Sequence, residues 1–156
     1  MIDYHIHTDI SADCKVPVRL MAQAARDAGL KEVGFSEHID LGVPVGPDFS
    51  VDFAAYEAAF EQTRREFPEL SLRQGIEAGL DLRYKDEIAA LLGSHPCDFV
   101  IGSLHLVFGH DPYYKDIWQQ YSQREIYDEY IRLSLETARS CDYYDILGHL
   151  GYIGKF

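Results

Sequence analysis

Histidine and glutamate residues recur along this chain at the ends of short apolar runs. They are His5, His7, His38, Glu77, His105 and His149. In a parallel sheet or barrel the same ends of successive strands lie together, so residues at these positions converge on one point. Imidazole nitrogen and carboxylate oxygen are ligands that zinc, manganese and iron share. The recurrence therefore restricts the chain to a fold that gathers strand ends, and it predicts a metal site there.

Short β-like runs alternate with helical stretches along the chain, an order that indicates an α/β fold with a parallel sheet or barrel. We expect strands at 2–7, 33–36, 70–76, 99–104 and 145–148, with helices between them. The last strand rests mainly on Ile146 and Leu147, a pair too short for periodicity to separate strand from helix. His38 is expected just after the second strand. Each of the five strands then delivers a candidate ligand.

Helix boundaries follow from residues that typically start or stop a helix. Pro17 is expected as the first residue of a helix that ends at Gly29, and Gly93 is expected to end the third helix. Ser122 and Glu125 predict a capping box for a long helix that follows the loop at 105–118.

The first two histidines are spaced so that they can share an ion. Residues two apart in a strand point the same way, so His5 and His7 can bind together while Ile6 packs on the opposite face. The carboxylate of Glu77 could bridge two ions.

Three acidic residues near the first strand compete for a further ligand position. Asp13 lies in a loop beyond the histidine pair, where it could close over another ion, but Asp3 and Asp9 are alternatives that spacing does not separate. Glu37 should point away from His38 if the second strand continues, so a supporting or structural role is expected for it.

Each candidate ligand also has a structural interpretation when taken alone. The histidines could be polar strand edges, caps or hydrogen-bonded core residues, and Glu77 could pair with an arginine. We do not expect these separate structural roles to account for all six residues at once. His95, before Pro96, and His110, in the loop, are more typical of the surface.

Composition indicates one globular domain of 156 residues, of which 47% are hydrophobic and 26% charged. The formal net charge of −12 disfavours nucleic acid and anionic lipid as partners and suits divalent metal. Three cysteines without CxxC spacing are not expected to form a disulfide framework. No apolar run approaches the ~18–20 residues of a membrane span, and no basic targeting region is visible. We expect a cytoplasmic protein without a membrane partner.

Five short motifs occur in order along the chain. They read HIHTDISAD at 5–13, SEH at 36–38, GIEAGL at 75–80, SLH at 103–105 and GHL at 148–150. In these motifs the chain resembles the polymerase-and-histidinol-phosphatase (PHP) superfamily, and within it the histidinol-phosphate phosphatase branch. The resemblance covers essentially the whole chain, and five ordered motifs are far more specific than any one of them.

The resemblance implies a distorted (β/α)7 barrel, similar to a TIM barrel, with up to three divalent metal ions at the C-terminal ends of the strands. It implies that His5 and His7 bind the first ion and that Glu77 bridges the first and second. His105 and His149 would complete the second ion's ligands.

The resemblance also implies that Asp13 and His38 hold the third ion. Zinc, manganese and iron all suit such ligands, and two or three ions are expected. Among the ligands, Glu77 and His105 are the residues that we expect to act in catalysis.

The chain departs from the family pattern at its end. The family's last motif, an Asp-x-His on the final strand, has no counterpart in the closing residues GYIGKF. A closed (β/α)8 barrel usually takes about 250 residues, so 156 residues supply about five of the seven β/α units. We therefore expect a single PHP-type domain at 1–156 that is incomplete at its C-terminus, either a truncated polypeptide or part of an assembly. A homo-oligomer or another partner is expected to cover the open barrel edge.

The implied activity is hydrolysis of a small-molecule phosphate monoester, with L-histidinol phosphate favoured as the substrate. A metal-activated water, its pKa lowered toward ~7, would attack phosphorus. A PHP-type phosphodiesterase or nuclease is disfavoured by the −12 charge, and a non-catalytic metal-binding or assembly fragment stays open because of the missing motif. Tyr113, Tyr114 and Trp118 could grip the substrate's organic part or pack on the next helix, and Arg83 and Lys85 could meet phosphate or cover the surface.

Overall fold

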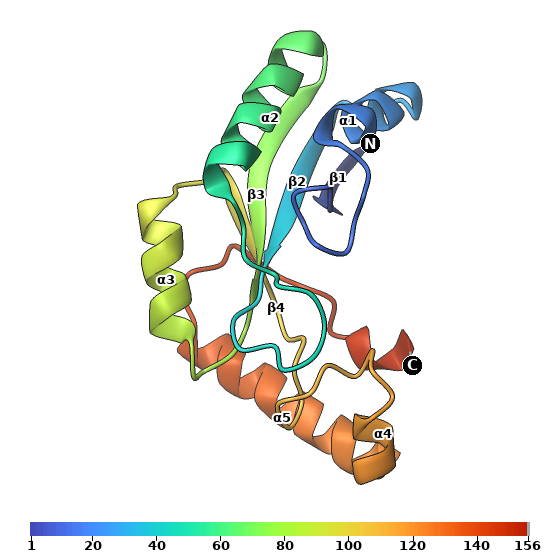
Figure 1. Cartoon of the computed structure of the whole chain (residues 1–156), viewed down its shortest axis with the longest axis vertical. Helices are drawn as coiled ribbons and strands as arrows, with labels where there is room; N and C mark the ends of the chain where they lie inside the picture. Colours follow the sequence, from blue (N-terminus) through green and yellow to red (C-terminus); the bar gives the residue numbers. More distant parts are fainter. Residues whose placement is uncertain (156) are drawn as a thin grey trace.

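A curled sheet of five parallel strands forms the centre of the molecule (Figure 1). The computed structural model describes residues 1–155. The strands lie side by side in sequence order: β1 (Ile2–Ile6), β2 (Glu32–Ile39), β3 (Ser71–Gly79), β4 (Phe99–Ser103) and β5 (Ile146–Leu147). All neighbours are parallel. The α/β class, the five strands and the partial TIM-like barrel are thereby confirmed.

Helices connect the strands and cover the outside of the curl. They are α1 (Val18–Asp27), α2 (Phe53–Glu66), α3 (Lys85–Ser94), α4 (Ile117–Gln120) and α5 (Gln123–Ser140), followed by the short helix η1 (Tyr152–Lys155). Figure 1 shows α1 and α2 beside the upper half of the sheet, with α3 and α5 around the lower half. Within residues 1–155, no helix has the length and apolar character that a bilayer span requires.

The C-terminus of α1 has the predicted glycine stop. Gly29 has a positive φ of 78°, a conformation that favours glycine. Its N–H donates to the carbonyl of Arg26, and the N–H of Leu30 donates to that of Ala25, which is the Schellman pattern. The expected capping box at the start of α5 is also present.

Two helix boundaries differ from the prediction. Pro17 precedes α1 instead of beginning it, because its ψ of 146° is extended while its carbonyl already accepts the first helical hydrogen bonds. Gly93 lies inside α3, which ends one residue later at Ser94. A glycine stops a helix when it adopts a positive φ, and Gly93 does not.

Strands β2 and β3 are longer than their apolar runs suggested. β2 continues to Ile39, so His38 lies within this strand and the prediction that it follows the strand was wrong. β3 continues to Gly79 and contains Glu77. Polar residues usually mark the end of an apolar strand, but here the chain keeps its sheet hydrogen bonds while the side chains turn inward. His38 and Glu77 are register partners in the parallel pair, so their side chains emerge together on one face.

Two separate hydrophobic cores surround the sheet. The larger core packs the outer face of the sheet against α1, α2 and α3; its most buried members include Val33, Phe35, Ile39, Ile76, Ala22, Tyr56, Phe60 and Ile88. The second core lies under α4 and α5 and contains Leu104, Val107, Ile117, Ile126, Tyr130 and Ile153. It attaches the chain around His149 to α5, because the Tyr130 hydroxyl donates to the His149 carbonyl at 3.0 Å.

The face that carries His38 and Glu77 is partly filled by stacked rings. Tyr4 and Phe99 stack with their centroids 4.9 Å apart. Gly75 makes room for them, because a Cβ at this position would lie 2.2 Å from Cζ of Phe99. This face is therefore packed by aromatic rings at one level and carries imidazoles at the next.

Candidate metal centre

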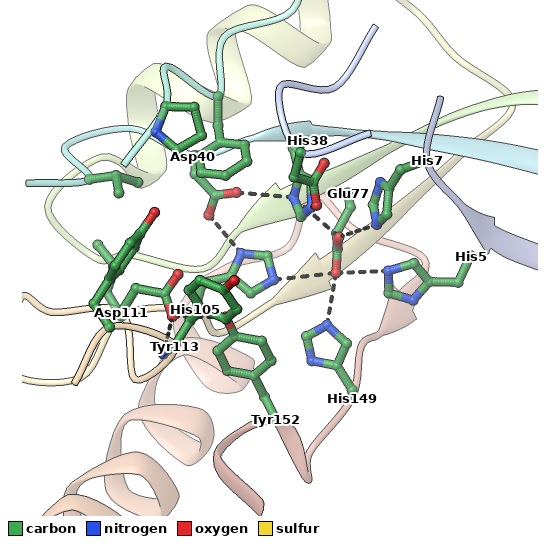
Figure 2. Close-up of a pocket in the computed structure, with 16 residues that line it drawn as sticks. His5, His7, His38, Asp40, Glu77, His105, Asp111, Tyr113, His149 and Tyr152 are labelled. Carbon is green, nitrogen blue, oxygen red and sulfur yellow. Dashed lines mark hydrogen bonds and ion pairs between the residues drawn. The ribbon is translucent and has the colours of Figure 1, made fainter. Parts of the chain in front are cut away.

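The carboxylate of Glu77 is fully buried and lies at the centre of the histidine cluster (Figure 2). Its Oε1 lies 3.0 Å from Nε2 of His5, 3.1 Å from Nε2 of His149 and 3.4 Å from Nε2 of His105. His5 lies in the first strand of the sheet and His149 follows the last, yet the centroids of their rings are only 5.4 Å apart. The curl of the sheet thus brings its two ends together at this point.

The other oxygen of Glu77 contacts two more imidazoles. Oε2 lies 3.3 Å from Nε2 of His7 and 3.3 Å from Nδ1 of His38. These two rings stack with centroids 4.1 Å apart and planes 8° apart. The expectation that His5 and His7 turn the same way is confirmed, since both reach Glu77, and Ile6 between them packs against the larger core.

The chemistry of this donor set fits divalent cations. A neutral imidazole that directs a lone pair at a carboxylate is repelled unless a proton or a cation lies between them. Both oxygens of Glu77, and Nδ1 of His7 and of His149, are buried without a well-formed hydrogen bond. Such orphaned buried groups are costly, and coordination to a metal would satisfy the carboxylate oxygens.

Ligand atoms gather in three overlapping groups, each within 4.8 Å. The groups are His5, Glu77 and His149; His7, His38 and Glu77; and His38, Asp40 and His105. Glu77 belongs to two of them, as a bridging carboxylate would. The candidate ligands predicted from the sequence therefore lie in one place.

Asp40 is a member of the cluster that the sequence did not single out. Its Oδ1 lies 2.8 Å from Nδ1 of His105, and its Oδ2 lies 3.2 Å from Nδ1 of His38. The sequence did contain a pattern that points to Asp40, because His38 and Asp40 have the same two-residue spacing as His5 and His7. It was missed because the second strand was expected to end at Ser36.

Asp13 is the acid of the first loop that reaches the site. Its Oδ2 lies 3.5 Å from Nε2 of His38, and it lines the pocket, as neither Asp3 nor Asp9 does. Asp3 instead accepts a hydrogen bond from the N–H of His5.

Glu37 explains how the first loop is held in place. This carboxylate is fully buried and accepts hydrogen bonds from the N–H and the hydroxyl of Thr8 and from the hydroxyl of Ser11. The Ser11 hydroxyl in turn accepts from the N–H of His38. Glu37 thus binds the loop to β2 with Asp13 over His38, in agreement with the expected supporting role.

The acids and imidazoles shift one another's protonation. Burial would lower the pKa of His38, but its contacts with Asp13 and Asp40 and the charge of Glu77 raise it to about 9. Burial would raise the pKa of Asp40, yet the neighbouring His105 and His38 lower it to about 2. Burial would likewise raise the pKa of Glu77, but the surrounding imidazoles lower it far below its ordinary value. Without metal the cluster therefore holds protons, and a metal would compete with them for the same nitrogens.

The cluster forms one wall of a cavity of about 840 Å³. Besides the ligands, its lining includes Phe49, Asp111, Tyr113, Tyr114 and Tyr152. The described lining contains four carboxylates and no lysine or arginine. An empty pocket of this kind would repel phosphate, so an anionic ligand needs bound cations.

Several residues for which the sequence suggested a possible role in the site lie outside this cavity. Arg83 pairs with Asp81, and neither Arg83 nor Lys85 lines the cavity. Trp118 packs in the second core and donates its indole N–H to the carbonyl of Pro112. His95 is exposed, as expected; His110 is half-buried and pairs with Asp116.

Comparison with known proteins agrees with this geometry. The family model named PHP domain matches residues 3–155. The histidinol-phosphatase of Lactococcus lactis is 33% identical over 157 residues, covering 99% of this chain and 58% of that protein. A Clostridium acetobutylicum protein named "Probable histidinol-phosphatase" is 30% identical, covering 100% of this chain and 59% of the relative. The chain thus spans about three fifths of the length of these relatives.

A solved structure matches the whole fold. The crystal structure of histidinol phosphate phosphatase from Lactococcus lactis, complexed with zinc, L-histidinol and phosphate, superposes with a TM-score of 0.93 at 34% identity. The match covers 99% of this chain and 59% of the other. The resemblance drawn from the five sequence motifs is thereby confirmed.

Proposed function

The chain belongs to the PHP domain family, and we propose from this membership and from the site that it hydrolyses a phosphate monoester with the help of divalent metal ions. The observation that carries the proposal is the convergence of five imidazoles on the buried carboxylate of Glu77. L-histidinol phosphate is the proposed substrate, because the Lactococcus lactis relative is named a histidinol-phosphatase and its crystal structure holds zinc, L-histidinol and phosphate.

We assign the ligands to the ions as follows. His5 and His7 would hold the first ion, Glu77 would be shared by the first and second, and His105 and His149 would hold the second. All four imidazoles lie within 3.4 Å of a Glu77 oxygen, which supports Glu77 as the ligand that the two ions share. The division of the imidazoles between the two ions rests on the family resemblance.

A third ion is assigned to His38 and Asp13, with Asp40 as an additional acid beside it. The 3.5 Å contact between Asp13 and His38 and the 3.2 Å contact between His38 and Asp40 support this part. Zinc, manganese and iron all suit the ligand set, and the proposal is for two or three ions.

Bound divalent ions would supply positive charge for the phosphate oxygens and lower the pKa of a water at the site. The chain's own residues make that possible. Glu77 brings an anionic charge between the imidazoles, and Asp40 holds Nδ1 of His105 so that Nε2 faces Glu77. We assign the catalytic roles to Glu77 and His105 on this basis. The described part of the cavity lining is rich in carboxylates and contains no lysine or arginine. The charge of a bound phosphate would therefore have to be neutralised by the ions.

We also propose that residues 1–156 act as one PHP-type domain, with Phe156 itself outside the described residues. The sheet order leaves β1 and β5 unpaired on their outer sides within the described chain. A second copy of the chain is proposed to cover the open edge at β5.

The test combines metal content with turnover. Purified protein is analysed for bound metals, stripped with a chelator, reloaded with zinc or manganese, and assayed for phosphate release from L-histidinol phosphate. Glu77→Gln, purified in parallel, controls for a contaminating phosphatase. Metal-dependent release that Glu77→Gln abolishes supports the proposal. Bound metal without any turnover would identify a metal-binding protein instead, and release from nucleic acid ends would identify a nuclease.

A further inference from the structure

Asp111 is a carboxylate of the cavity that the metal cluster does not use. It lies in the segment between β4 and α4, lines the cavity, and belongs to none of the three ligand groups. Figure 2 shows Asp111 and Tyr113 on the far side of His105 from His5. An acid at this position adds negative charge to a cavity meant for an anionic substrate, so it needs an explanation beyond phosphate binding.

Two hydrogen bonds hold the Asp111 carboxylate in one orientation. Its Oδ1 accepts from the N–H of Tyr113 at 2.9 Å and from the hydroxyl of Tyr152 at 2.8 Å. No described residue donates to Oδ2. That oxygen is therefore available to a ligand in the cavity.

Tyr152 connects Asp111 to the metal cluster. Its ring stacks on that of His149, with centroids 5.1 Å apart, and contacts that of His105 at 5.3 Å. The acid is thus fixed beside the place where phosphate is proposed to bind. A substrate whose phosphate reaches the ions would bring its organic part toward this side of the cavity.

The walls around Asp111 are aromatic. Tyr113 and Tyr114 pack edge to face and, together with Phe49, line the same cavity. The Tyr114 hydroxyl packs on Gly46, whose open backbone leaves room for it, so the segment after β2 meets the segment after β4 here. Aromatic faces next to a carboxylate form a favourable environment for an organic cation.

We propose that Asp111 is a specificity-determining residue that binds a protonated amine on the organic part of the phosphate ester. This inference rests on the proposed function and adds to it the residue that selects the leaving group. The ammonium group donates to Oδ2 while Tyr152 and the Tyr113 N–H keep Oδ1 in place. The ions then select the phosphate and Asp111 selects the amine.

Asp48 provides a matched control. Its Oδ1 accepts from the N–H of Ser50, two residues ahead, in the same kind of turn that Asp111 makes with Tyr113. Asp48 is exposed and does not line the cavity. Asp48→Asn therefore removes one charge and perturbs one such turn without touching the proposed amine site.

The experiment compares L-histidinol phosphate with its deamino analogue, which lacks only the amine. The ratio of their kcat/KM values is measured for the zinc-loaded wild-type protein, Asp111→Asn and Asp48→Asn. The corresponding alcohols are titrated into the same zinc-loaded proteins by calorimetry, which reads binding without turnover. We expect Asp111→Asn to lower the preference for the amine-bearing compound about tenfold, because one charge-assisted hydrogen bond is lost. Asp48→Asn should keep the wild-type preference.

The two readouts separate this inference from the proposed function. If no ester is hydrolysed but the calorimetric preference for the amine is lost in Asp111→Asn, the catalytic proposal fails and the amine site stands. If Asp111→Asn keeps the wild-type preference, the amine binds elsewhere, for example directly to the metal, and the inference is overturned. A wild-type protein that binds both alcohols equally, or neither, overturns it as well.

Discussion

Oδ1 of Asp40 accepts a hydrogen bond from Nδ1 of His105 at 2.8 Å, and both side chains are buried. With its proton held on Nδ1, the neutral ring of His105 presents the lone pair of Nε2 toward Glu77, 3.4 Å away. A carboxylate that fixes the tautomer and orientation of a histidine in this way is a common support for metal ligands. Under the proposed function, Asp40 would orient His105 toward an ion.

The first prediction concerns this support. Asp40→Asn should weaken metal binding by roughly 10–100-fold, because a neutral amide lacks the charge of Asp40 and can turn an NH2 donor toward His105, so it no longer fixes the tautomer of this ring. Competition with a metal chelator measures the affinity. Asp116→Asn is the control, since Asp116 pairs with Nδ1 of His110 at the same 2.8 Å but outside the cluster. Equal affinities in both variants would refute the role of Asp40.

The second prediction compares two fully buried glutamates on neighbouring strands. Glu77→Gln should lose most of the bound metal, because a neutral amide cannot bridge cations among the imidazoles. Glu37→Gln should keep the metal bound through Glu77 but lower the free energy of unfolding by about 1–3 kcal/mol, because its hydrogen bonds to Thr8 and Ser11 are disturbed. Elemental analysis and urea unfolding measure the two effects. Full metal content in Glu77→Gln would contradict the bridging role.

The third prediction concerns pH and the metal-free protein. The pKa of His38 rises from 6.5 to about 9 on folding, so its contribution to stability is complete below pH 6.5 and is lost as pH rises through about 9. The free energy of unfolding should fall across this window, by at most roughly 3 kcal/mol from this residue. The zinc-loaded protein should show the opposite trend, because metal binding needs deprotonated imidazole.

Urea unfolding in the presence of a chelator, at several pH values, tests this dependence. His38→Asn should flatten the slope of the metal-free protein. His95→Asn, at an exposed histidine outside the cluster, should leave it unchanged. A metal-free wild-type protein whose stability is constant or increases across the window would show that the contacts of His38 with Asp13 and Asp40 do not form.

The fourth prediction concerns the open edge of the sheet. We expect the protein to associate with a second copy, because strands with unpaired outer edges and exposed apolar residues tend to pair. Leu150, 63% exposed beyond β5, and Ile131, 64% exposed on α5, are equally accessible leucine-sized residues in different places. Leu150→Lys should shift sedimentation toward the monomer and Ile131→Lys should not. A wild-type protein that sediments as a folded monomer would contradict the expectation.

Much of the site could be predicted before the fold was known. The imidazoles follow or end apolar strand-like runs, and the conserved geometry of parallel strands brings such ends together. The two-residue spacing of His5 and His7 was enough to place both on one face. Local sequence was therefore enough to predict which residue types act as candidate ligands and in what order they occur along the chain.

Other residues depended on contacts between distant segments. Asp13, Asp3 and Asp9 are equivalent by composition, and only the attachment of the first loop to Glu37 selects Asp13. Asp111 gained significance only once Tyr152, far along the chain, was found to donate to it.

The sequence alone therefore predicted the types of candidate ligand, the strands in their order along the chain and the family, because these follow from local periodicity and from short ordered motifs. The tertiary structure decided which carboxylates contact the imidazoles and which one lines the cavity apart from them. Those choices depend on how tightly the sheet curls and on where its loops are anchored, and both are set by packing across many elements at once.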